Sequence, residues 1–252
     1  MFLPPNTCRY CFHDVLSTDQ WARDMVPAPV AAILLCFPVT KASNDHATAQ
    51  QAAIEADPSS NEVDESIFFM EQHVGNACGT IGLLHAVGNS KGKVEYPEDS
   101  WLGRFYPQAK GLDGKALGEM LEQDEEIEEA HVEASVAVEE GQPEVQHDVD
   151  DSRANLHFIA FVEVKGRLYE LDGCKSQPIN HVATTADTFF ADTCGVIQGF
   201  MARDPENMNF NIVALGPAEH AADEGGGGDG GNEGGENDDD LANMLALSML
   251  QQ

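Results

Sequence analysis

The stretch EQHVGNACGTIGLLHAVG, from Glu71 to Gly88, decides the fold of this chain. Small and turn-forming residues surround Cys78, and an apolar run of helical character follows. The pattern predicts a helix over Cys78–Asn89 with the cysteine in its first turn. The positive end of a helix dipole favours the thiolate form of cysteine, which is the form that attacks carbonyl carbons. A small buried side chain in a core helix is the alternative interpretation of Cys78.

A second informative stretch, NLHFIAFVEVKGRLYELDG, begins at Asn155. Its alternation of apolar and polar residues predicts two strands, His157–Val164 and Arg167–Leu171. The dipeptide between them, Lys165-Gly166, suits a tight hairpin turn. The stretch therefore predicts a two-stranded antiparallel ribbon.

The predicted ribbon brings a histidine and an aspartate to the same end. His157 opens the first strand, and Asp172 directly follows the second. An imidazole held by a carboxylate takes the proton of a thiol, and the carboxylate stabilises the resulting imidazolium. Gln72, six residues before Cys78, suits the role of donor to an oxyanion, with the backbone N–H of Cys78 as a second donor.

Each of these residues also has a structural interpretation. His157 could be a histidine at a strand edge, Asp172 a turn residue before a glycine, and Gln72 an exposed polar side chain. The joint occurrence of all four residue types favours a thiol hydrolase.

These segments resemble the ubiquitin carboxyl-terminal hydrolases, in their short single-domain branch (peptidase C12-like). The resemblance runs from about Phe12 to about Leu215. It rests on the following segments: MVPAPVAAILLCFPVT (Met25–Thr40), QHVGNACGTIGLLHA (Gln72–Ala86), LHFIAFVEVKGRLYELDG (Leu156–Gly173), PINH (Pro178–His181) and FMARDPENMNFNIVAL (Phe200–Leu215).

The resemblance implies roles for the same four residues. Cys78 would be the nucleophile, His157 the general base and proton donor, Asp172 the residue that orients His157, and Gln72 the oxyanion donor. It also implies an α+β fold of the papain-related type, with a central antiparallel sheet flanked by helices and a knotted backbone. The implied reaction is cleavage of amide, ester or thioester adducts from the C-terminal glycine of ubiquitin through an acyl-enzyme.

The start of the chain leaves a second function open. Family members carry a further strand and helix before the position that matches Phe12, and this sequence lacks them. Their loss would expose apolar surface and disturb the site. The alternative is therefore a catalytically impaired adaptor that binds ubiquitin.

Composition narrows the classes of partner. The 252 residues include 13 Lys and Arg against 44 Asp and Glu, a net charge of −31. Such a charge repels nucleic acid and attracts a basic protein face such as that of ubiquitin. No apolar run is long enough to span a membrane, and no basic stretch leads into an apolar core as in a signal peptide. We expect a monomer in the cytoplasm, with the nucleus as an alternative location.

The cysteines favour a reducing compartment. All six lack the spacing of a disulfide framework: Cys8, Cys11, Cys36, Cys78, Cys174 and Cys194. Cys8 and Cys11 form a CxxC pair, but no second CxxC or matching histidine pair accompanies it. We therefore expect no metal and no cofactor.

The chain divides into four predicted regions: an atypical segment 1–11, a catalytic domain 12–218, an acidic glycine-rich linker 219–237 and a helix 238–252. Within the domain, Pro29–Val39 predicts a strand buried on both faces. The stretch Lys41–Glu65 predicts a loop with some helix, and further helices are predicted over Leu112–Glu129 and Asp187–Arg203. The polar stretch Glu133–Arg153 resembles the family loop that crosses the active site and limits substrates to small or unfolded adducts.

The last fifteen residues, DDDLANMLALSMLQQ, resemble a ubiquitin-interacting motif. An acidic cluster precedes an apolar face at helical spacing, formed by Leu241, Met244, Leu245 and Ser248. Met244 stands where the motif has alanine, so the fit is imperfect. A disordered or dimerising amphipathic tail is the alternative.

Overall fold

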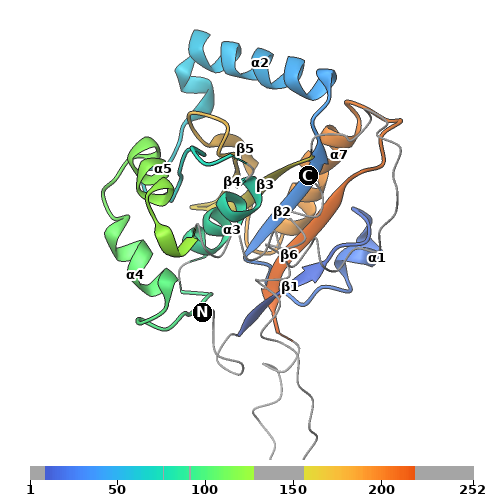
Figure 1. The fold of residues 1–252 in the computed structure, drawn as a ribbon. Coiled ribbons are helices and arrows are strands. Elements are labelled where there is room, and N and C mark those ends of the chain that lie inside the picture. The colour runs from blue at the N-terminus through green and yellow to red at the C-terminus, as the bar shows by residue number, and fades with distance from the viewer. Residues whose placement is uncertain (1–8, 76, 91, 128–155, 219–252) are drawn as a thin grey trace, which may run out of the picture.

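The computed structural model describes residues 9–75, 77–90, 92–127 and 156–218. Its centre is a six-stranded antiparallel sheet with the strand order β1-β6-β2-β3-β4-β5 (Figure 1). The strands are β1 (Tyr10–Asp14), β2 (Ala32–Pro38), β3 (Leu156–Val164), β4 (Arg167–Leu171), β5 (Ile179–Ala183) and β6 (Asn211–Pro217). The helices are α1 (Gln20–Arg23), α2 (Lys41–Ala56), α3 (Cys78–Asn89), α4 (Trp101–Gln108), α5 (Gly114–Glu122) and α7 (Phe189–Met201), with a 3₁₀ helix η1 (Pro58–Asn61).

The predicted two-sided burial of the middle strand is confirmed. All seven residues of β2 are buried, and β2 pairs with β3 on one side and β6 on the other. Successive side chains of a strand point to opposite faces. Accordingly, Leu34 packs into one hydrophobic core and its neighbours Ile33 and Leu35 into the other. The sheet therefore carries a core on each face.

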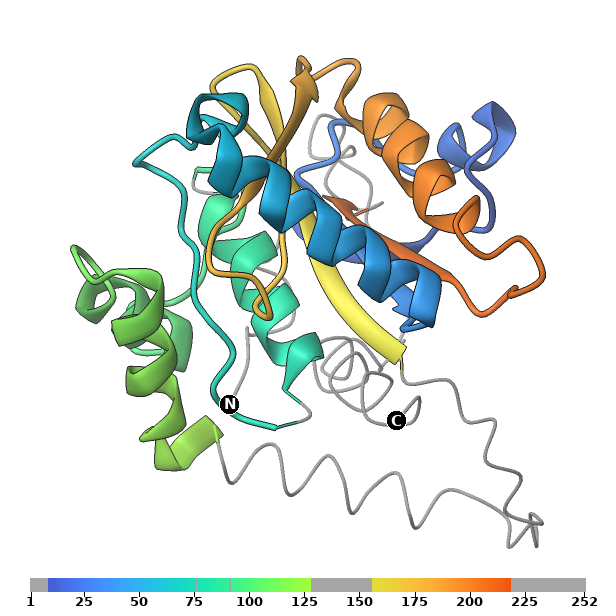
Figure 2. The ribbon, with the colours of Figure 1, turned by 90° about the horizontal axis from the view of Figure 1, so that it is seen from above.

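Helices cover both faces of this sheet. Helix α3 packs against β2 and β3, and α4 and α5 extend the core on that side. Helix α7 contributes Phe189, Ile197 and Phe200 to the core of the opposite face. Figure 2 shows α3 and α7 on the two sides of the sheet, with α2 crossing in front of it. The expected α+β architecture of an antiparallel sheet between helices is confirmed.

The prediction of a loop with some helix over Lys41–Glu65 underestimated the helix, because α2 extends over sixteen residues. Alanine has the highest helix propensity, and the segment is rich in it. A capping box also starts the helix: Thr40 Oγ1 accepts from the Ser43 N–H, and Ser43 Oγ accepts from the Thr40 N–H. The serine at the third helical position is a weaker signal than the usual Glu or Gln.

The single helix predicted over Leu112–Glu129 was also wrong, because α5 ends at Glu122. Asp113 caps its start by accepting from the Ala116 N–H at 2.8 Å. Asp124 then accepts from two further backbone N–H groups at 3.1 Å, those of Glu126 and Ile127, and so interrupts the helix with a new capped turn. By contrast, the helix predicted over Cys78–Asn89 is confirmed at both ends.

At the start of the described chain, β1 begins at Tyr10 and pairs with β6 from Tyr10↔Pro217 to Asp14↔Val213.

The predicted crossing loop 133–153, the linker 219–237 and the helix 238–252 lie outside the described residues. The chain between α5 and β3 passes through the same undescribed region, so the knotted backbone stays a prediction. Among the described residues, no helix combines the length and apolar character needed to cross a membrane.

Candidate active site

The β3–β4 hairpin brings His157 and Asp172 together as predicted. Lys165 and Gly166 form its turn with φ values of 50° and 80°, the left-handed conformation that such two-residue turns require. The register pairs Val164 with Arg167 and Ala160 with Leu171. Beyond that last pair, His157 Nε2 lies 2.7 Å from Asp172 Oδ1.

Packing and hydrogen bonding both hold the His157 ring. Phe37 of β2 lies opposite His157 in the sheet register, and their rings meet edge to face with centroids 5.8 Å apart. Burial disfavours the imidazolium, but the hydrogen bonds and the negative charge of Asp172 outweigh it and raise the pKa of His157 well above its usual value. The site therefore stabilises the protonated imidazole.

Cys78 is the first residue of α3 and is 5% exposed. Burial alone would raise the pKa of Cys78, but its hydrogen bond with His157 and the positive charge of that ring lower it below the usual value. The backbone N–H groups of Phe158 and Gly79 add to this effect. Since Asp172 engages Nε2 of His157, the other ring nitrogen is the one left for the thiol.

A second buried thiol near the histidine behaves in the opposite way. Burial and the negative charge of Cys78 raise the pKa of Cys36 to about 12. Cys36 is therefore a neutral thiol, whereas the surroundings of Cys78 favour its thiolate form.

Backbone hydrogen bonds hold the segment that carries Gln72. The N–H of Met70 donates to Nε2 of His85 at 3.0 Å, and the N–H of Glu71 donates to the Gly114 carbonyl at 2.8 Å. The N–H of Gln72 donates to the Gly173 carbonyl at 2.8 Å, which places Gln72 beside Asp172. Burial lowers the pKa of His85 to about 4, so this ring accepts the Met70 bond as a neutral imidazole.

The side-chain amide of Gln72 is only partly engaged. Its Nε2 donates to the Val74 carbonyl at 3.1 Å, while its buried Oε1 has no hydrogen-bond partner among the described residues. Among the residues that the structure describes, the second N–H of the amide has no acceptor. The structure thus brings together all four residues that the sequence singled out: Cys78, His157, Asp172 and Gln72.

Gly173 allows the close contact between the two parts of the site. A Cβ atom at this position would lie 2.8 Å from Ile81 Cγ2 and 3.1 Å from Gln72 Cβ. We expect Gly173→Ala to lower the free energy of unfolding by about 1–3 kcal/mol, as overpacking of a core does. It should also reduce activity, because the Gln72 segment must move.

Gly195 of α7 provides the matched control, because a Cβ atom there meets nothing within 4 Å. Gly195→Ala should leave activity unchanged and raise stability by up to about 1 kcal/mol, as expected in an exposed helix. Chemical denaturation of both variants measures the difference. Equal stabilities would show that Gly173 is not a tight contact.

Cys174, which directly follows Gly173, was not predicted as a site residue. The N–H of Cys174 donates to Asp172 Oδ1 at 2.9 Å, and its thiol hydrogen-bonds with His157. Its position two residues after a catalytic candidate was the available signal.

Of the CxxC pair, Cys8 lies outside the described residues, and Cys11 Sγ lies 3.2 Å from His13 Nε2.

A buried charged cluster, centred on Glu170, was also not predicted from the sequence; Glu170 is 1% exposed. Lys175 and His181 both contact its carboxylate, the latter at 2.8 Å. Burial opposes the ionised form, but the charges of Lys175 and His181 prevail and lower the pKa of Glu170 to about 2. Lys175 Nζ also donates to Gln50 Oε1 at 2.9 Å. The cluster thus links β4 and β5 to α2.

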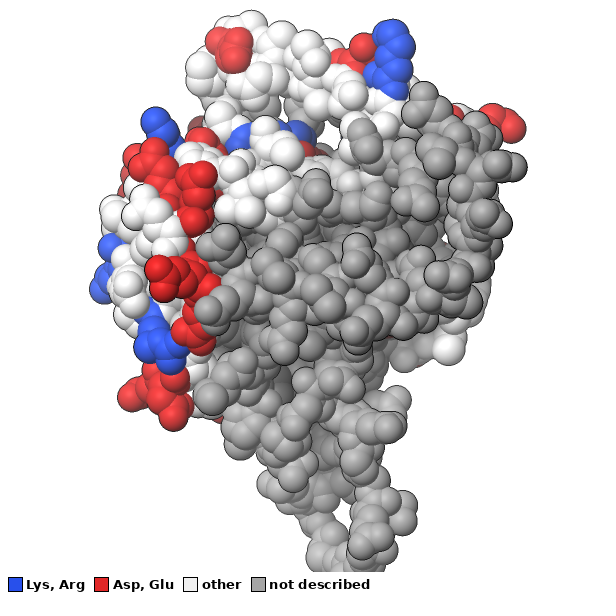
Figure 3. Space-filling model, viewed as in Figure 1, with Lys and Arg blue, Asp and Glu red and all other residues white. Residues whose placement is uncertain are grey.

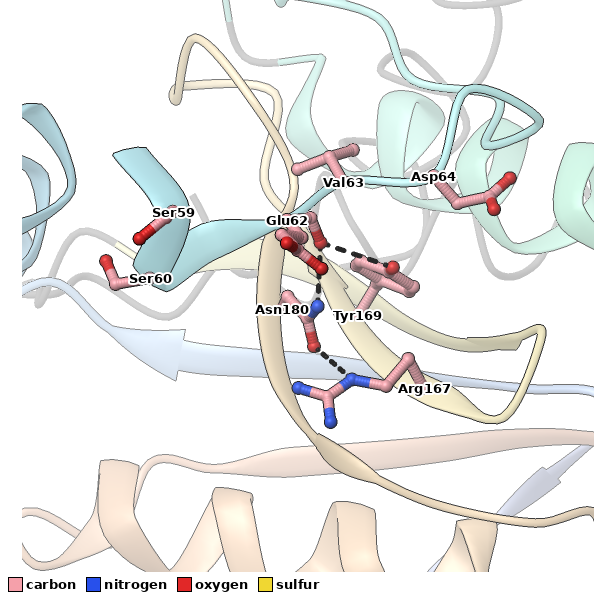
Figure 4. Close-up of a pocket in the computed structure, with 8 residues that line it drawn as sticks. All are labelled: Ser59, Ser60, Glu62, Val63, Asp64, Arg167, Tyr169 and Asn180. Carbon is pink, nitrogen blue, oxygen red and sulfur yellow. Dashed lines mark hydrogen bonds between the residues drawn. The ribbon is translucent and has the colours of Figure 1, made fainter. Parts of the chain in front are cut away.

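A surface pocket lies apart from these residues (Figure 4). Arg167 Nε donates to Asn180 Oδ1 at 2.9 Å, and Asn180 Nδ2 donates to the Glu62 carbonyl at 2.7 Å. The Tyr169 hydroxyl donates to the same carbonyl at 3.4 Å. These hydrogen bonds connect the segment after η1 to the β3–β4 hairpin and to β5. None of the four candidate residues lines the pocket, so the pocket is not part of the candidate active site.

A buried cysteine at a helix start, beside an imidazole that a carboxylate holds, is the arrangement of a cysteine hydrolase. The family model described as "Ubiquitin carboxyl-terminal hydrolase, family 1" matches residues 6–202. The chain is 39% identical over 203 residues to ubiquitin carboxyl-terminal hydrolase 3 of Arabidopsis thaliana, covering 81% of this chain and 82% of that protein. It is 37% identical over 204 residues to ubiquitin carboxyl-terminal hydrolase isozyme L1 of Homo sapiens, covering 81% and 86%.

Solved structures agree on the fold. The catalytic domain of Trichinella spiralis UCH37, solved bound to ubiquitin vinyl methyl ester, matches with a TM-score of 0.58 at 20% identity, covering 84% of this chain and 87% of that one. The chain therefore belongs to the ubiquitin carboxyl-terminal hydrolases of family 1, which are cysteine-dependent hydrolases.

Proposed function

We propose that this chain is a deubiquitinating thiol hydrolase that cleaves amide, ester or thioester adducts from the C-terminal glycine of ubiquitin. The observation that carries the proposal is the position of His157, which hydrogen-bonds with Asp172 at 2.7 Å and also with Cys78. The family relationship supports ubiquitin as the acyl group.

In the first half of the reaction, the Cys78 thiolate attacks the carbonyl carbon of the terminal glycine. The carbonyl oxygen becomes an oxyanion, to which the free N–H of Gln72 and the backbone N–H of Cys78 donate. The carbon–nitrogen bond of an amide adduct then breaks, and the leaving amine takes a proton from the His157 imidazolium. The product is a thioester between Cys78 and ubiquitin.

In the second half, water attacks the thioester carbonyl and gives a proton to His157. The carbon–sulfur bond breaks, which releases the ubiquitin carboxylate and restores the Cys78 thiolate. Asp172 holds the imidazole in one orientation throughout and stabilises its protonated form.

Long-range charge favours encounter with a basic partner. The chain carries a net charge of −31, and Asp and Glu side chains line the α4–α5 edge in Figure 3 with Lys and Arg between them. Some of these charges pair locally, as Arg104 does with Glu126 at 2.6 Å. The excess negative charge raises association rates with a basic face of ubiquitin, and salt reduces the effect.

The test is hydrolysis of ubiquitin that carries a fluorogenic amide at its C-terminus. The full-length chain should release the fluorophore catalytically under reducing conditions. Binding of ubiquitin by folded protein without turnover would instead support the adaptor alternative.

The C-terminal segment 238–252 is proposed as a second ubiquitin-binding element, with Leu241, Met244, Leu245 and Ser248 as its contact face. A tethered weak site raises the local concentration of substrate. Deleting 238–252 should weaken binding of ubiquitin chains in calorimetry while leaving hydrolysis of a saturating fluorogenic substrate unchanged. If chain binding is the same with and without the segment, the motif assignment is wrong.

A further inference from the structure

Three potential metal ligands lie close together around the His157 ring, on the side that faces Asp172. His157, Asp172 and Cys174 each offer one ligand atom, and these atoms all lie within 4.8 Å of one another. They form the only group of three or more such residues within the described part of the chain. Cys174 is exposed, so an ion can reach the group from solvent.

The nature and spacing of these donors suit zinc. Zn²⁺ binds imidazole nitrogen, carboxylate oxygen and thiolate sulfur at about 2.0–2.3 Å. In a tetrahedral site, such bonds place neighbouring ligand atoms roughly 3.3–3.7 Å apart. The 2.7 Å contact between His157 Nε2 and Asp172 Oδ1 would therefore open by about 1 Å or less. The Cys174 thiol already contacts the same ring.

Charge favours a divalent ion at this position. The Asp172 carboxylate and a Cys174 thiolate together neutralise the two positive charges of Zn²⁺, and burial of a neutral group costs far less than burial of a charged one. Asp172 and His157 have side chains that are only 10% and 13% exposed, so the ion would be largely shielded from water. A water molecule would complete the four-coordinate shell.

We propose that His157, Asp172 and Cys174 form an inhibitory zinc site. The ion takes the place of the proton between Nε2 and the Asp172 carboxylate, and the Cys174 thiol loses its proton as it becomes a ligand. Zinc then separates His157 from Asp172, so the ring loses the group that orients it and stabilises its protonated form. The sequence predicted no metal for this chain, so the zinc site departs from that prediction, and zinc here acts as a reversible inhibitor.

The binding of zinc follows from the ligand geometry alone, whereas its inhibitory effect rests on the proposed function. A metal that binds only the Cys78 thiolate would inhibit any thiol hydrolase without using Cys174. The two cases separate in the variant Cys174→Ser, which removes the sulfur ligand at an exposed position.

The control is Cys11→Ser, which removes the thiol of a cysteine–histidine contact within β1, where Cys11 Sγ lies 3.2 Å from His13 Nε2. Both variants are compared with the wild-type chain after removal of metal by a chelator, and circular dichroism confirms that each is folded. Zn²⁺ affinity is measured by competition with a chromogenic chelator, and inhibition is measured relative to the zinc-free rate of each protein.

The wild-type chain and Cys11→Ser should bind one equivalent of Zn²⁺ with the same affinity. Cys174→Ser should bind at least about tenfold more weakly, since even outer-shell changes at metal sites cost about 10–100-fold. The inhibitory zinc concentration should rise by the same factor. Co²⁺ bound to the wild-type chain should show thiolate-to-metal charge-transfer absorption that Cys174→Ser weakens.

Equal Zn²⁺ affinity and equal inhibition in the wild-type chain and Cys174→Ser would overturn the zinc site. Zinc binding that depends on Cys174 in a chain without hydrolase activity would uphold the metal site and refute the proposed function. Hydrolase activity in a chain that binds no zinc would uphold the proposed function and refute the metal site.

Discussion

Cys78→Ala is expected to lower kcat/KM for fluorogenic ubiquitin amides by about 10⁵-fold or more, the scale seen when the nucleophile of a hydrolase is removed. The alanine cannot form the thioester. Cys78 is 5% exposed, and loss of its sulfur removes little packing, so the variant should fold and bind ubiquitin as the wild-type chain does.

Cys36→Ala is the matched control for this result. Cys36 is a buried thiol whose pKa burial raises to about 12, so it does not supply a thiolate. Its replacement should change kcat/KM by less than about tenfold, with any loss traceable to stability. A large loss in Cys36→Ala together with retained activity in Cys78→Ala would reverse the assignment of the nucleophile.

Asp172→Asn is expected to lower kcat by about 10³–10⁴-fold, comparable to the loss of the orienting aspartate in other hydrolase triads. The amide keeps the shape of the side chain but removes the charge that stabilises the His157 imidazolium. The thiolate of Cys78 then loses part of its stabilisation, so the pKa of Cys78 should rise.

Alkylation by iodoacetamide measures this shift, because the thiolate is the reacting form. In the wild-type chain, the Cys78 alkylation rate falls only when the pH drops below the lowered pKa. In Asp172→Asn, the fall should occur at higher pH. Glu170→Gln is the control: Glu170 is a buried carboxylate two residues upstream, and it contacts Lys175 and His181. That variant should lose stability without moving the alkylation profile.

The parts of the site that depend on local pattern were predictable from sequence. The helix over Cys78–Asn89 and the hairpin turn at Lys165-Gly166 follow from small residues, apolar runs and a glycine in the turn. Because antiparallel pairing places the two ends of a hairpin together, the contact between His157 and Asp172 followed from the same pattern.

Other parts depend on contacts between distant segments, which no local pattern reports. Gln72 reaches the site because its N–H bonds to the carbonyl of Gly173, about a hundred positions away in the chain. Cys174, by contrast, lies against His157 because it follows Asp172 by two residues and its N–H donates to Asp172 Oδ1. Helix α2 was misread because alanine-rich polar sequence suits both loop and helix, and its serine capping box was not recognised.

The most direct test of Cys78 as the nucleophile is intact-mass analysis of the full chain after reaction with ubiquitin carrying an electrophilic C-terminus. We predict a single covalent adduct of one ubiquitin per chain, with peptide mapping that places the bond on Cys78 and no adduct in Cys78→Ala. Absence of an adduct from folded, reduced protein, or an adduct carried by Cys174, would contradict Cys78 as the nucleophile.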